Sequence, residues 1–464
     1  MGIALVEAVI ADLGIVEVGE LAMSGSTVPP VLSSPLAVAE VAVSSVAACL
    51  IAAADLSLAR SGRRPEVALD TGHVAAAMRS EAWLRDPAGH GLSGFAPLSR
   101  LWPSGDGWVR THANYPWHRA ALLGALGIAD TAGDDVEVLV GDAIAQRSAR
   151  DVEETVYDAG GLAVAARGAA EWRQGDAGSA VAASSLVATD PLPTTAGVVL
   201  LPVGSPGELP ASGVKVLDLT RVIAGPVGTR MLAALGADVL RVDHPARPEL
   251  ALHAIDGVIG KASTTLDATT QGGYDVLHGL VDEADVVVTG YRPGSLRRLG
   301  LDADQVAERH PGTVVVSLSA WGTSGPWGAR RGFDSLVQIA TGIGRATSPD
   351  GNRPGALPCQ LLDHATGYLL AAGTLAALAG RARTGQASHV SVSLARTAKW
   401  LLDQGARTED QHTTAEQAET QAAAYRASLG DGWSSISPPG QIDGQALRWP
   451  HLPPRYGRAR PAWA

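Results

Sequence analysis

The chain has 464 residues, of which 46% are hydrophobic and 18% are charged, and its formal net charge is −11. This composition excludes a largely disordered chain, and it excludes a general binder of nucleic-acid phosphates, which would need clustered lysine and arginine. Cys49 and Cys359 are the only cysteines, so a disulfide framework is excluded and a reducing cytoplasm is favoured. The length predicts two to three domains.

The N-terminal part of the chain has the wrong polarity for a secretory signal. It carries Glu7, Asp12, Glu17 and Glu20 but no lysine or arginine before the apolar stretch that follows. That alanine-rich stretch spans positions 36–59, but Glu40 and Asp55 interrupt it, which favours a buried helix over a membrane span. We therefore predict a soluble cytoplasmic protein with no membrane partner.

A stretch rich in proline and glycine at residues 186–213 predicts a linker between two structured regions. Beyond it, valine-rich runs alternate with segments long enough for crossover helices. This alternation predicts an α/β fold with a Rossmann-like open parallel sheet and flanking helices. The predicted strands include residues 214–219, 239–242, 286–288 and 314–318, and the predicted helices include residues 227–235 and 274–283. No GxGxxG fingerprint follows the first strand, which disfavours NAD binding.

A series of short motifs runs in a set order through residues 214–402. The motifs are Val214-Lys-Val-Leu-Asp-Leu-Thr220, Ala224-Gly225-Pro226, Tyr291-Arg-Pro-Gly294, Trp321-Gly-Thr-Ser-Gly-Pro326, Gly332-Phe-Asp334 and Leu362-Asp363-His-Ala-Thr-Gly367. In this order they resemble the family III CoA-transferases, a group that includes the formyl-, carnitine- and bile-acid-CoA transferases and the related 2-methylacyl-CoA racemases. The resemblance implies an enzyme that moves coenzyme A from an acyl-CoA to a carboxylic acid, with Asp363 as its catalytic aspartate.

This chemistry suits a carboxylate nucleophile, because the thioester must be broken without losing the acyl group to water. Asp363 would attack the thioester carbonyl to form a mixed anhydride, and the released thiolate would then form an aspartyl-CoA thioester that the incoming acid displaces. Asp363 lies near a predicted helix N-terminus, where backbone amides would favour its ionised form and stabilise an oxyanion. The alternative is a plain helix N-cap.

The resemblance also implies residues that contact coenzyme A. Arginine suits phosphate through its bidentate fork, and small residues in a turn let the backbone approach a ligand. The implied contacts are Ala224, Gly225 and Pro226 in the turn after the first strand, together with Arg241, Lys261 and Arg292. The alternative for each cation is a solvated surface charge. The family often carries a longer basic string around the lysine, whereas this chain reads Val258-Ile-Gly-Lys-Ala262. No spacing typical of a metal site occurs, so we predict no metal, no permanently bound cofactor and no nucleic-acid partner.

One position distinguishes transferases from racemases. The racemase motif reads Gly-His-Asp, and this chain has Gly332-Phe333-Asp334. Phenylalanine cannot carry a proton, so transfer is favoured over racemisation. His364 follows Asp363 directly, but neighbouring positions on a helix do not face each other, which favours a packing or surface role for it.

The segment before the linker repeats part of the segment after it. When Glu40 is aligned with Asp363, a helix-then-strand pattern continues in both segments without a gap. The longer glutamate side chain displaces its carboxylate, so Glu40 is not the expected nucleophile. Residues 95–185 look like the family's small α+β domain, which here precedes the catalytic region.

We therefore predict five segments. They are a degenerate repeat at 1–94, the small-domain-like segment at 95–185, the linker at 186–213, the catalytic region at 214–402, and a polar linker with a closing segment at 403–464. The altered order leaves a non-catalytic CoA-binding subunit as the main alternative function. The resemblance implies a homodimer, and the alternative is one pseudo-symmetric unit within a single chain. The sequence does not identify the acyl-CoA donor or the acid acceptor.

Overall fold

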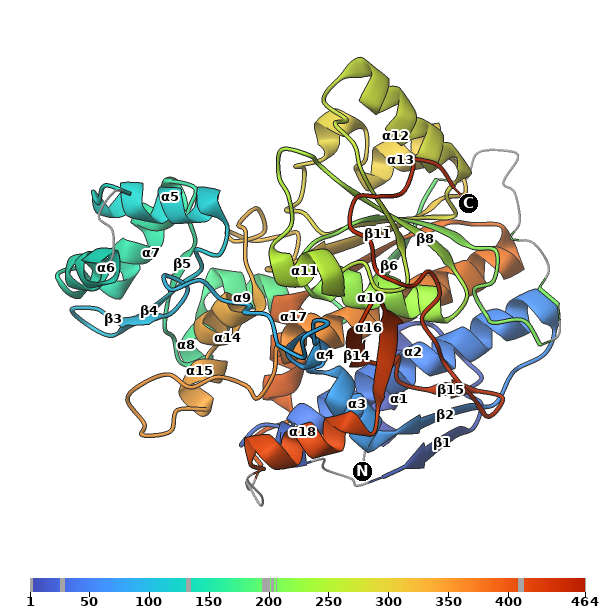
Figure 1. The fold of residues 1–464 in the computed structure, drawn as a ribbon, viewed down its shortest axis with the longest axis horizontal. Coiled ribbons are helices and arrows are strands. Elements are labelled where there is room, and N and C mark those ends of the chain that lie inside the picture. The colour runs from blue at the N-terminus through green and yellow to red at the C-terminus, as the bar shows by residue number, and fades with distance from the viewer. Residues whose placement is uncertain are drawn as a thin grey trace.

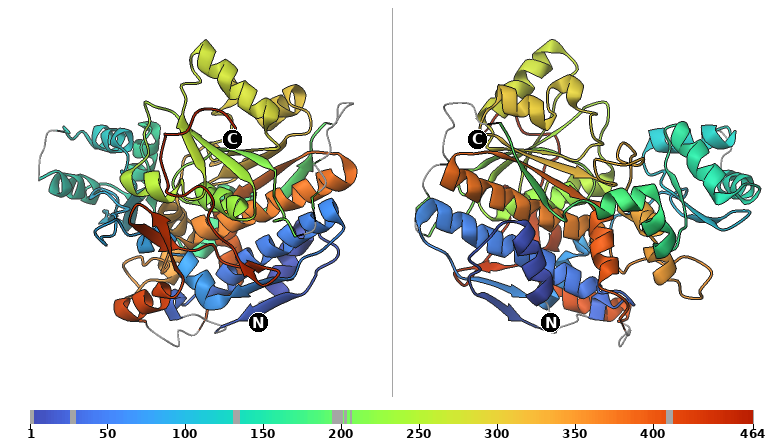
Figure 2. Two further views of the ribbon diagram at one scale, coloured as in Figure 1. Left: turned by 45° about the vertical axis from the view of Figure 1, so that its right-hand side comes forward. Right: turned by 180° about the vertical axis from the view of Figure 1, so that it is seen from behind.

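The computed structural model describes residues 3–25, 30–130, 135–193, 201, 204–205, 207–407 and 413–463. Parts of the segments predicted at 186–213 and 403–464 lie outside the described residues. Figure 1 shows one large body with a smaller lobe at its left edge, and the same lobe projects from the body in both views of Figure 2.

A seven-stranded sheet forms the centre of the large body. Its strand order is β6-β12-β11-β10-β7-β8-β9, and all neighbouring pairs are parallel except β12 with β6. The strands are β6 (Ala188–Pro191), β7 (Lys215–Leu219), β8 (Asp238–Asp243), β9 (Ala262–Thr265), β10 (Val286–Thr289), β11 (Val314–Ser319) and β12 (Ser388–Ser393). The predicted parallel sheet is thereby confirmed. The strand order reverses beside β7, and open α/β sheets bind ligands at the carboxyl ends of strands at such a point.

Helices cover both faces of this sheet. In Figure 1, α12 and α13 lie above it, whereas α10, α16 and α2 lie below it. The helices of this region are α10 (Ala224–Ala234), α11 (Ala251–Asp256), α12 (Gln271–Glu283), α13 (Ala303–Arg309), α14 (Asp334–Thr341), α15 (Ile343–Ala346), α16 (Leu361–Thr384) and α17 (Leu394–Asp403), with the 3-10 turn η3 (Arg297–Leu299).

The start of α10 corrects one prediction. The sequence placed Ala224, Gly225 and Pro226 in a turn before the helix, but all three belong to its first turn. A proline is tolerated there because the first amides of a helix have no partner within the helix.

The N-terminal segment matches the region around Asp363 in local geometry. Helix α2 (Val38–Ser61) and helix α16 both have 24 residues, and each ends at a left-handed glycine, Gly62 with φ 73° and Gly385 with φ 76°. Strand β2 (Val67–Asp70) leads into α3 (Thr71–Ala77) as β12 leads into α17. Asp70 and Ser393 cap these two helices by accepting a hydrogen bond from the amide three residues on. Each of these features falls at matching positions when Glu40 is aligned with Asp363, as a duplicated unit requires.

Helices α2 and α16 pack against each other in the core of the large body. By length and hydropathy alone each could cross a membrane, but 94% of the residues in the most apolar window of each helix are buried inside the protein. The buried helix predicted over positions 36–59 is thus present. Because the two equivalent helices meet within one chain, their packing supports the alternative in which the two halves form one pseudo-symmetric unit.

Most of the segment predicted at 95–185 forms the smaller lobe, which has its own apolar core. The lobe comprises β3 (Leu101–Pro103), β4 (Trp108–Thr111), α5 (Pro116–Leu126), α6 (Val136–Ala145), α7 (Ala149–Asp158) and β5 (Ala163–Ala165). The helices that follow, α8 (Ala169–Gln174) and α9 (Asp176–Ala182), pack against α14, α15 and α17 of the large body. The remaining elements are α1 (Ile3–Asp12), β1 (Leu21–Ser24), η1 (Pro30–Leu32), α4 (Ser80–Trp83), α18 (Ala415–Ala423), β13 (Arg426–Gly430), β14 (Trp433–Ile436), β15 (Gln441–Ile442) and β16 (Gln445–Ala446). Strands β1, β2, β15 and β16 form a second sheet from both ends of the chain.

Candidate active site

Asp363 lies in the first turn of α16 and is only 6% exposed. It lines two cavities, a larger one of about 830 Å³ and a smaller one of about 230 Å³. Within the described part of the chain its carboxylate accepts no hydrogen bond, although its own backbone amide donates one to Asp334. A buried carboxylate between two cavities, with its oxygens unengaged, is available to react with a bound substrate.

Small residues bring this helix close to α10. A side-chain carbon at Gly228 of α10 would lie 2.6 Å from the carbonyl oxygen of Gly367, and one at Gly367 would lie 2.5 Å from the carbonyl oxygen of Ala224. Such distances are well below van der Waals contact, so glycine is required at both positions. This close packing places Asp363 beside the first turn of α10, at the edge of the sheet where β7 ends.

Two further carboxyl groups, those of Asp334 and Glu81, lie near Asp363. The amide of Asp363 donates to Asp334 Oδ2 at 3.0 Å, and Asp334 also accepts from the side chain of Gln338. Burial, followed by the charges of Asp334 and Glu81, raises the pKa of Asp363 well above its usual value. Burial also raises the pKa of Asp334 to about 6. The sequence predicted that helix amides would favour ionised Asp363, but burial and the charges of Asp334 and Glu81 raise its pKa instead.

We expect this cluster to make the free energy of unfolding depend on pH. In the unfolded chain these carboxyls ionise near pH 3.8, whereas Asp334 in the folded chain ionises near pH 6. Between these values the folded protein retains protons that the unfolded chain releases, so its stability falls as the pH rises. Asp363→Asn removes one of the like charges. Its free energy of unfolding should therefore exceed that of the wild type by about 1–2 kcal/mol at about pH 8, with little difference at about pH 4. Urea unfolding at both pH values tests this, and a difference that does not change with pH would refute it.

His364 contacts a different carboxylate. Its buried Nε2 lies 2.7 Å from Glu81 Oε2, on α4 of the N-terminal segment. His364 lines neither of the two cavities around Asp363. The imidazole therefore positions Glu81 near the aspartate and does not face the reacting space.

The larger cavity is lined by positive and aromatic side chains. Its wall includes six arginines, namely Arg221, Arg247, Arg292, Arg298, Arg330 and Arg331. The rings of Tyr115 and Trp117 stack at 4.7 Å, and the guanidinium of Arg247 lies 4.6 Å from the Trp117 ring centre. In a chain of net charge −11, this local concentration of arginine suits an anionic ligand that also carries an aromatic ring.

The predicted coenzyme A contacts divide into two groups. Ala224 and Arg292 line the larger cavity, whereas Gly225, Pro226, Arg241 and Lys261 are not part of its wall. The Arg241 guanidinium donates to Asp243 at 2.8 Å and to Glu249 at 3.0 Å, and its side chain is fully buried. Lys261 Nζ donates to Asp218 Oδ2 at 2.9 Å and to the carbonyl oxygen of Pro226 at 3.1 Å.

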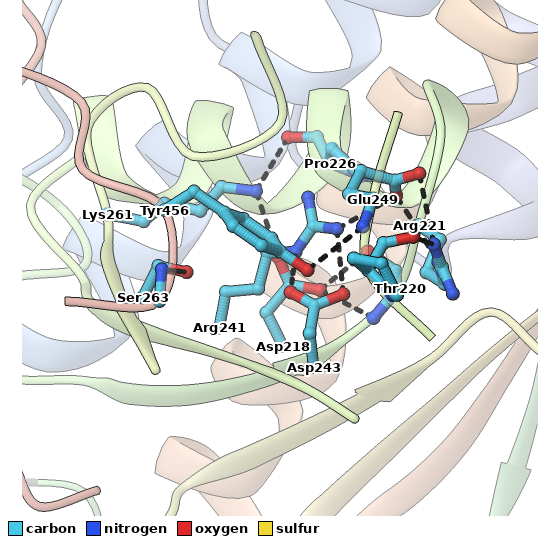
Figure 3. A network of polar contacts seen from close by, with 12 residues as sticks. Asp218, Thr220, Arg221, Pro226, Arg241, Asp243, Glu249, Lys261, Ser263 and Tyr456 are labelled. Carbon is cyan, nitrogen blue, oxygen red and sulfur yellow. Dashed lines mark hydrogen bonds and ion pairs between the residues drawn. The ribbon is translucent and has the colours of Figure 1, made fainter. Parts of the chain in front are cut away.

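Figure 3 shows Arg241, Lys261 and their partners pointing toward one another. Glu249, which Arg241 contacts, also accepts hydrogen bonds from Arg221, and Arg221 does line the cavity. The structure thus places Arg241 and Lys261 in buried ion pairs. These pairs do not line the cavity but stabilise the residues next to it. The alternative considered for each cation was a solvated surface charge, and Arg241 and Lys261 are not surface charges either.

The model of CoA-transferase family III matches residues 211–447, just over half of the chain. The chain belongs to this family. A probable fatty acyl-CoA transferase of Mycobacterium tuberculosis is 36% identical over 207 residues, which cover 42% of this chain and 52% of that protein. The formyl-CoA:oxalate CoA-transferase of Streptomyces coelicolor is 34% identical over 193 residues, covering 39% of this chain and 47% of the relative.

Among solved structures, one of the same M. tuberculosis protein is 37% identical with a TM-score of 0.38, covering 41% of this chain and 56% of that chain. A CAIB/BAIF family protein from Brucella suis is 29% identical with a TM-score of 0.38, covering 44% of this chain and 60% of that chain. The chain spans about half the length of the curated relatives it matches.

Several site residues of this family member come from segments outside the matched region. Tyr115 and Trp117 belong to the smaller lobe, and Glu81 belongs to the N-terminal segment. His112, also from the smaller lobe, stacks on Phe333 with ring centres 3.7 Å apart. Sequence reasoning missed all four as site residues, because no local pattern shows which distant segment will pack against residues 214–402.

Proposed function

We propose that the chain moves coenzyme A between an acyl-CoA and a carboxylic acid, with Asp363 as the nucleophile. The observation that carries this proposal is that the Asp363 side chain lines both cavities. A transferase that handles two acids in turn needs one reactive group within reach of both the CoA thiol and the acyl group. An aspartate that only capped a helix would have no need of such a position.

The larger cavity suits coenzyme A. Its volume of about 830 Å³ lies within the range of cofactor-binding pockets. Its arginines can bind the phosphates, and the stacked Tyr115 and Trp117 rings offer an aromatic surface for the adenine. When the nucleotide is bound by these arginines and aromatic rings, the pantetheine arm can place the thioester carbonyl beside Asp363.

The proposed reaction proceeds in balanced exchanges. The Asp363 carboxylate attacks the thioester carbonyl, and the C–S bond breaks to give a mixed anhydride and CoA thiolate. The thiolate attacks the aspartyl carbonyl and releases the first acid as a carboxylate. The second acid then attacks the aspartyl thioester, the C–S bond breaks, and a second mixed anhydride and CoA thiolate form. The thiolate attacks the acyl carbonyl of the second acid in this anhydride, which gives the new acyl-CoA and restores the Asp363 carboxylate. Burial protects the two anhydrides and the aspartyl thioester from water.

Transfer is preferred to racemisation because Phe333 occupies the position of the racemase histidine and carries no proton. A non-catalytic CoA-binding subunit is the other alternative, and the experiment below distinguishes it from a transferase. The cytoplasmic location predicted from the composition and the homodimer implied by the resemblance both stay predictions.

The test is to trap the intermediate on Asp363. The protein is incubated with a panel of acyl-CoAs and then with hydroxylamine, and its peptides are examined by mass spectrometry. We expect a hydroxamate on Asp363 in the wild type and in Glu40→Gln, and none in Asp363→Asn. A folded protein that binds coenzyme A but forms no adduct with any donor would contradict the transferase and support the non-catalytic subunit.

A further inference from the structure

Glu249, in the loop between β8 and α11, is a buried carboxylate that binds donors from three separate segments of the chain. Its side chain is fully buried and lines neither of the two cavities. Oε1 accepts hydrogen bonds from the Tyr115 hydroxyl at 2.5 Å and from Arg221 Nη2 at 3.1 Å. Oε2 accepts from Arg241 Nη2 at 3.0 Å and from the amide of Val222 at 3.3 Å. Burial raises the pKa of Glu249, but the charges of Arg221 and Arg241 outweigh this effect and lower it to about 2, so the carboxylate is ionised at neutral pH.

Arg221 lines the larger cavity, but most of its donors are already engaged. A guanidinium has five N–H groups. With the described residues, those of Arg221 make two hydrogen bonds to Glu249, one to the carbonyl oxygen of Arg247 and one to that of Pro248. The central carbon of the guanidinium lies 5.0 Å from the centre of the Tyr115 ring. Arg221 therefore supports an aromatic ring and has one N–H group left for a ligand.

The Tyr115 ring is one layer of a stack that joins the smaller lobe to the large body. Tyr115 and Trp117 come from the lobe and stack at 4.7 Å, and the guanidinium of Arg247, from the body, lies 4.6 Å from the Trp117 ring centre. Together with Arg221 these residues line the larger cavity. Burial, followed by the charge of Glu249, raises the pKa of Tyr115, so its hydroxyl keeps its proton and donates it to the carboxylate. This hydrogen bond fixes the lobe's half of the stack to the body.

Glu249 also contacts a strained residue between the two cavities. Val222 has a φ of 67°, a left-handed conformation that is unfavourable for a β-branched side chain. Val222 lines both cavities, and its amide donates to Glu249. A backbone in such a conformation persists only where the surrounding contacts determine it. Glu249 is one of the contacts that keep this turn in place.

We propose that Glu249 is a positioning residue for the nucleotide end of coenzyme A, because it fixes Tyr115 and Arg221 so that the aromatic stack is formed before the ligand arrives. This inference rests on the proposed transferase function, since it concerns the cavity assigned there to coenzyme A. Glu249 contacts neither the ligand nor Asp363 in this proposal. A wall that is already ordered binds its ligand more tightly, because the loss of side-chain freedom no longer opposes binding. Loss of Glu249 should therefore weaken binding of coenzyme A without slowing the bond-making steps.

The experiment measures binding of coenzyme A to the full chain by titration calorimetry. We expect Tyr115→Phe, which keeps the ring and removes the hydroxyl, to weaken binding about three- to tenfold, and Glu249→Gln to weaken it about ten- to a hundredfold. Tyr115→Phe should have a smaller effect in Glu249→Gln than in the wild type, because the two side chains act through the same hydrogen bond. Tyr425→Phe is the matched control and should bind normally. Its hydroxyl donates to Asp70 Oδ1 at 2.7 Å, and neither residue lines the two cavities.

A second ligand and a rate separate positioning from a general loss of structure. Adenosine 3′,5′-bisphosphate, the nucleotide part of coenzyme A without its thiol arm, should be weakened by the same factor as coenzyme A. At saturating acyl-CoA, Glu249→Gln should form the Asp363 adduct within about twofold of the wild-type rate. If Glu249→Gln does not fold, Tyr115→Phe provides the test, since it leaves the ion pairs of Glu249 intact.

Unchanged affinity for coenzyme A in both variants, or an equal loss in Tyr425→Phe, would overturn the inference. An adduct rate that falls as much as the affinity would also overturn it. Because binding requires no turnover, weakened binding in a protein that forms no Asp363 adduct would refute only the transfer. A normal adduct with unchanged binding would refute only the role of Glu249, and a folded wild type that does not bind coenzyme A would refute both.

Discussion

Asp363→Asn is expected to lower kcat/KM for CoA transfer by about 10⁴-fold or more, because it removes the group that forms both covalent intermediates. The amide that replaces the carboxylate is a poor nucleophile and cannot form an anhydride. Affinity for coenzyme A should change by no more than a few-fold, since the arginines and aromatic rings of the larger cavity are untouched. Steady-state rates from chromatographic measurement of the product acyl-CoA, together with equilibrium binding of coenzyme A, provide the two values.

Glu40→Gln is the matched control for this experiment. Glu40 is the third residue of α2 as Asp363 is the third residue of α16. However, Arg407 Nε donates to Glu40 Oε1 at 2.9 Å, and Glu40 lines neither of the two cavities. We expect near-normal transfer from Glu40→Gln. Retention of transfer by Asp363→Asn, or an equal loss in both variants, would contradict the assignment of the nucleophile.

Lys261→Met is expected to lower the free energy of unfolding by about 3–5 kcal/mol, because it leaves Asp218 buried without its cation. Both side chains are fully buried, and Lys261 Nζ also donates to Thr229 Oγ1 at 2.6 Å and to the Pro226 carbonyl. The variant is therefore expected to destabilise both the end of β7 and the first turn of α10. Urea denaturation followed by circular dichroism measures the change.

Two further variants show whether burial of the charge is the cause. Lys215→Met breaks a pair with Glu283 that is 32% and 58% exposed, so it should cost less than about 1 kcal/mol. The double variant Asp218→Leu with Lys261→Met should recover much of the lost stability, because no unpaired charge then remains. If Lys261→Met and Lys215→Met cost the same, the buried pair is not the stabilising element that its geometry indicates.

The local pattern of residues was enough to predict the central sheet and the place of Asp363. Val286 to Val288 form a run that is apolar at every position, and this is typical of a strand buried on both faces. The alignment of Glu40 with Asp363 predicted two related helices, which turn out to have equal length and equivalent ends. These features depend on residues close together in the chain, where periodicity and capping are expressed directly in the sequence.

The tertiary structure alone decided which charges face the ligand. Arg241 and Lys261 have the residue types of ligand contacts, but packing placed Asp243 and Asp218 beside them and buried the pairs. Conversely, Tyr115 and Trp117 are remote from Asp363 in sequence, and only the docking of the smaller lobe brings them to the wall of the larger cavity. The sequence by itself determined the family, the sheet and the place of the candidate nucleophile, whereas the partners of each charge depended on which distant segments pack together. The physical reason is that the energy of a buried charge depends on its neighbours in space.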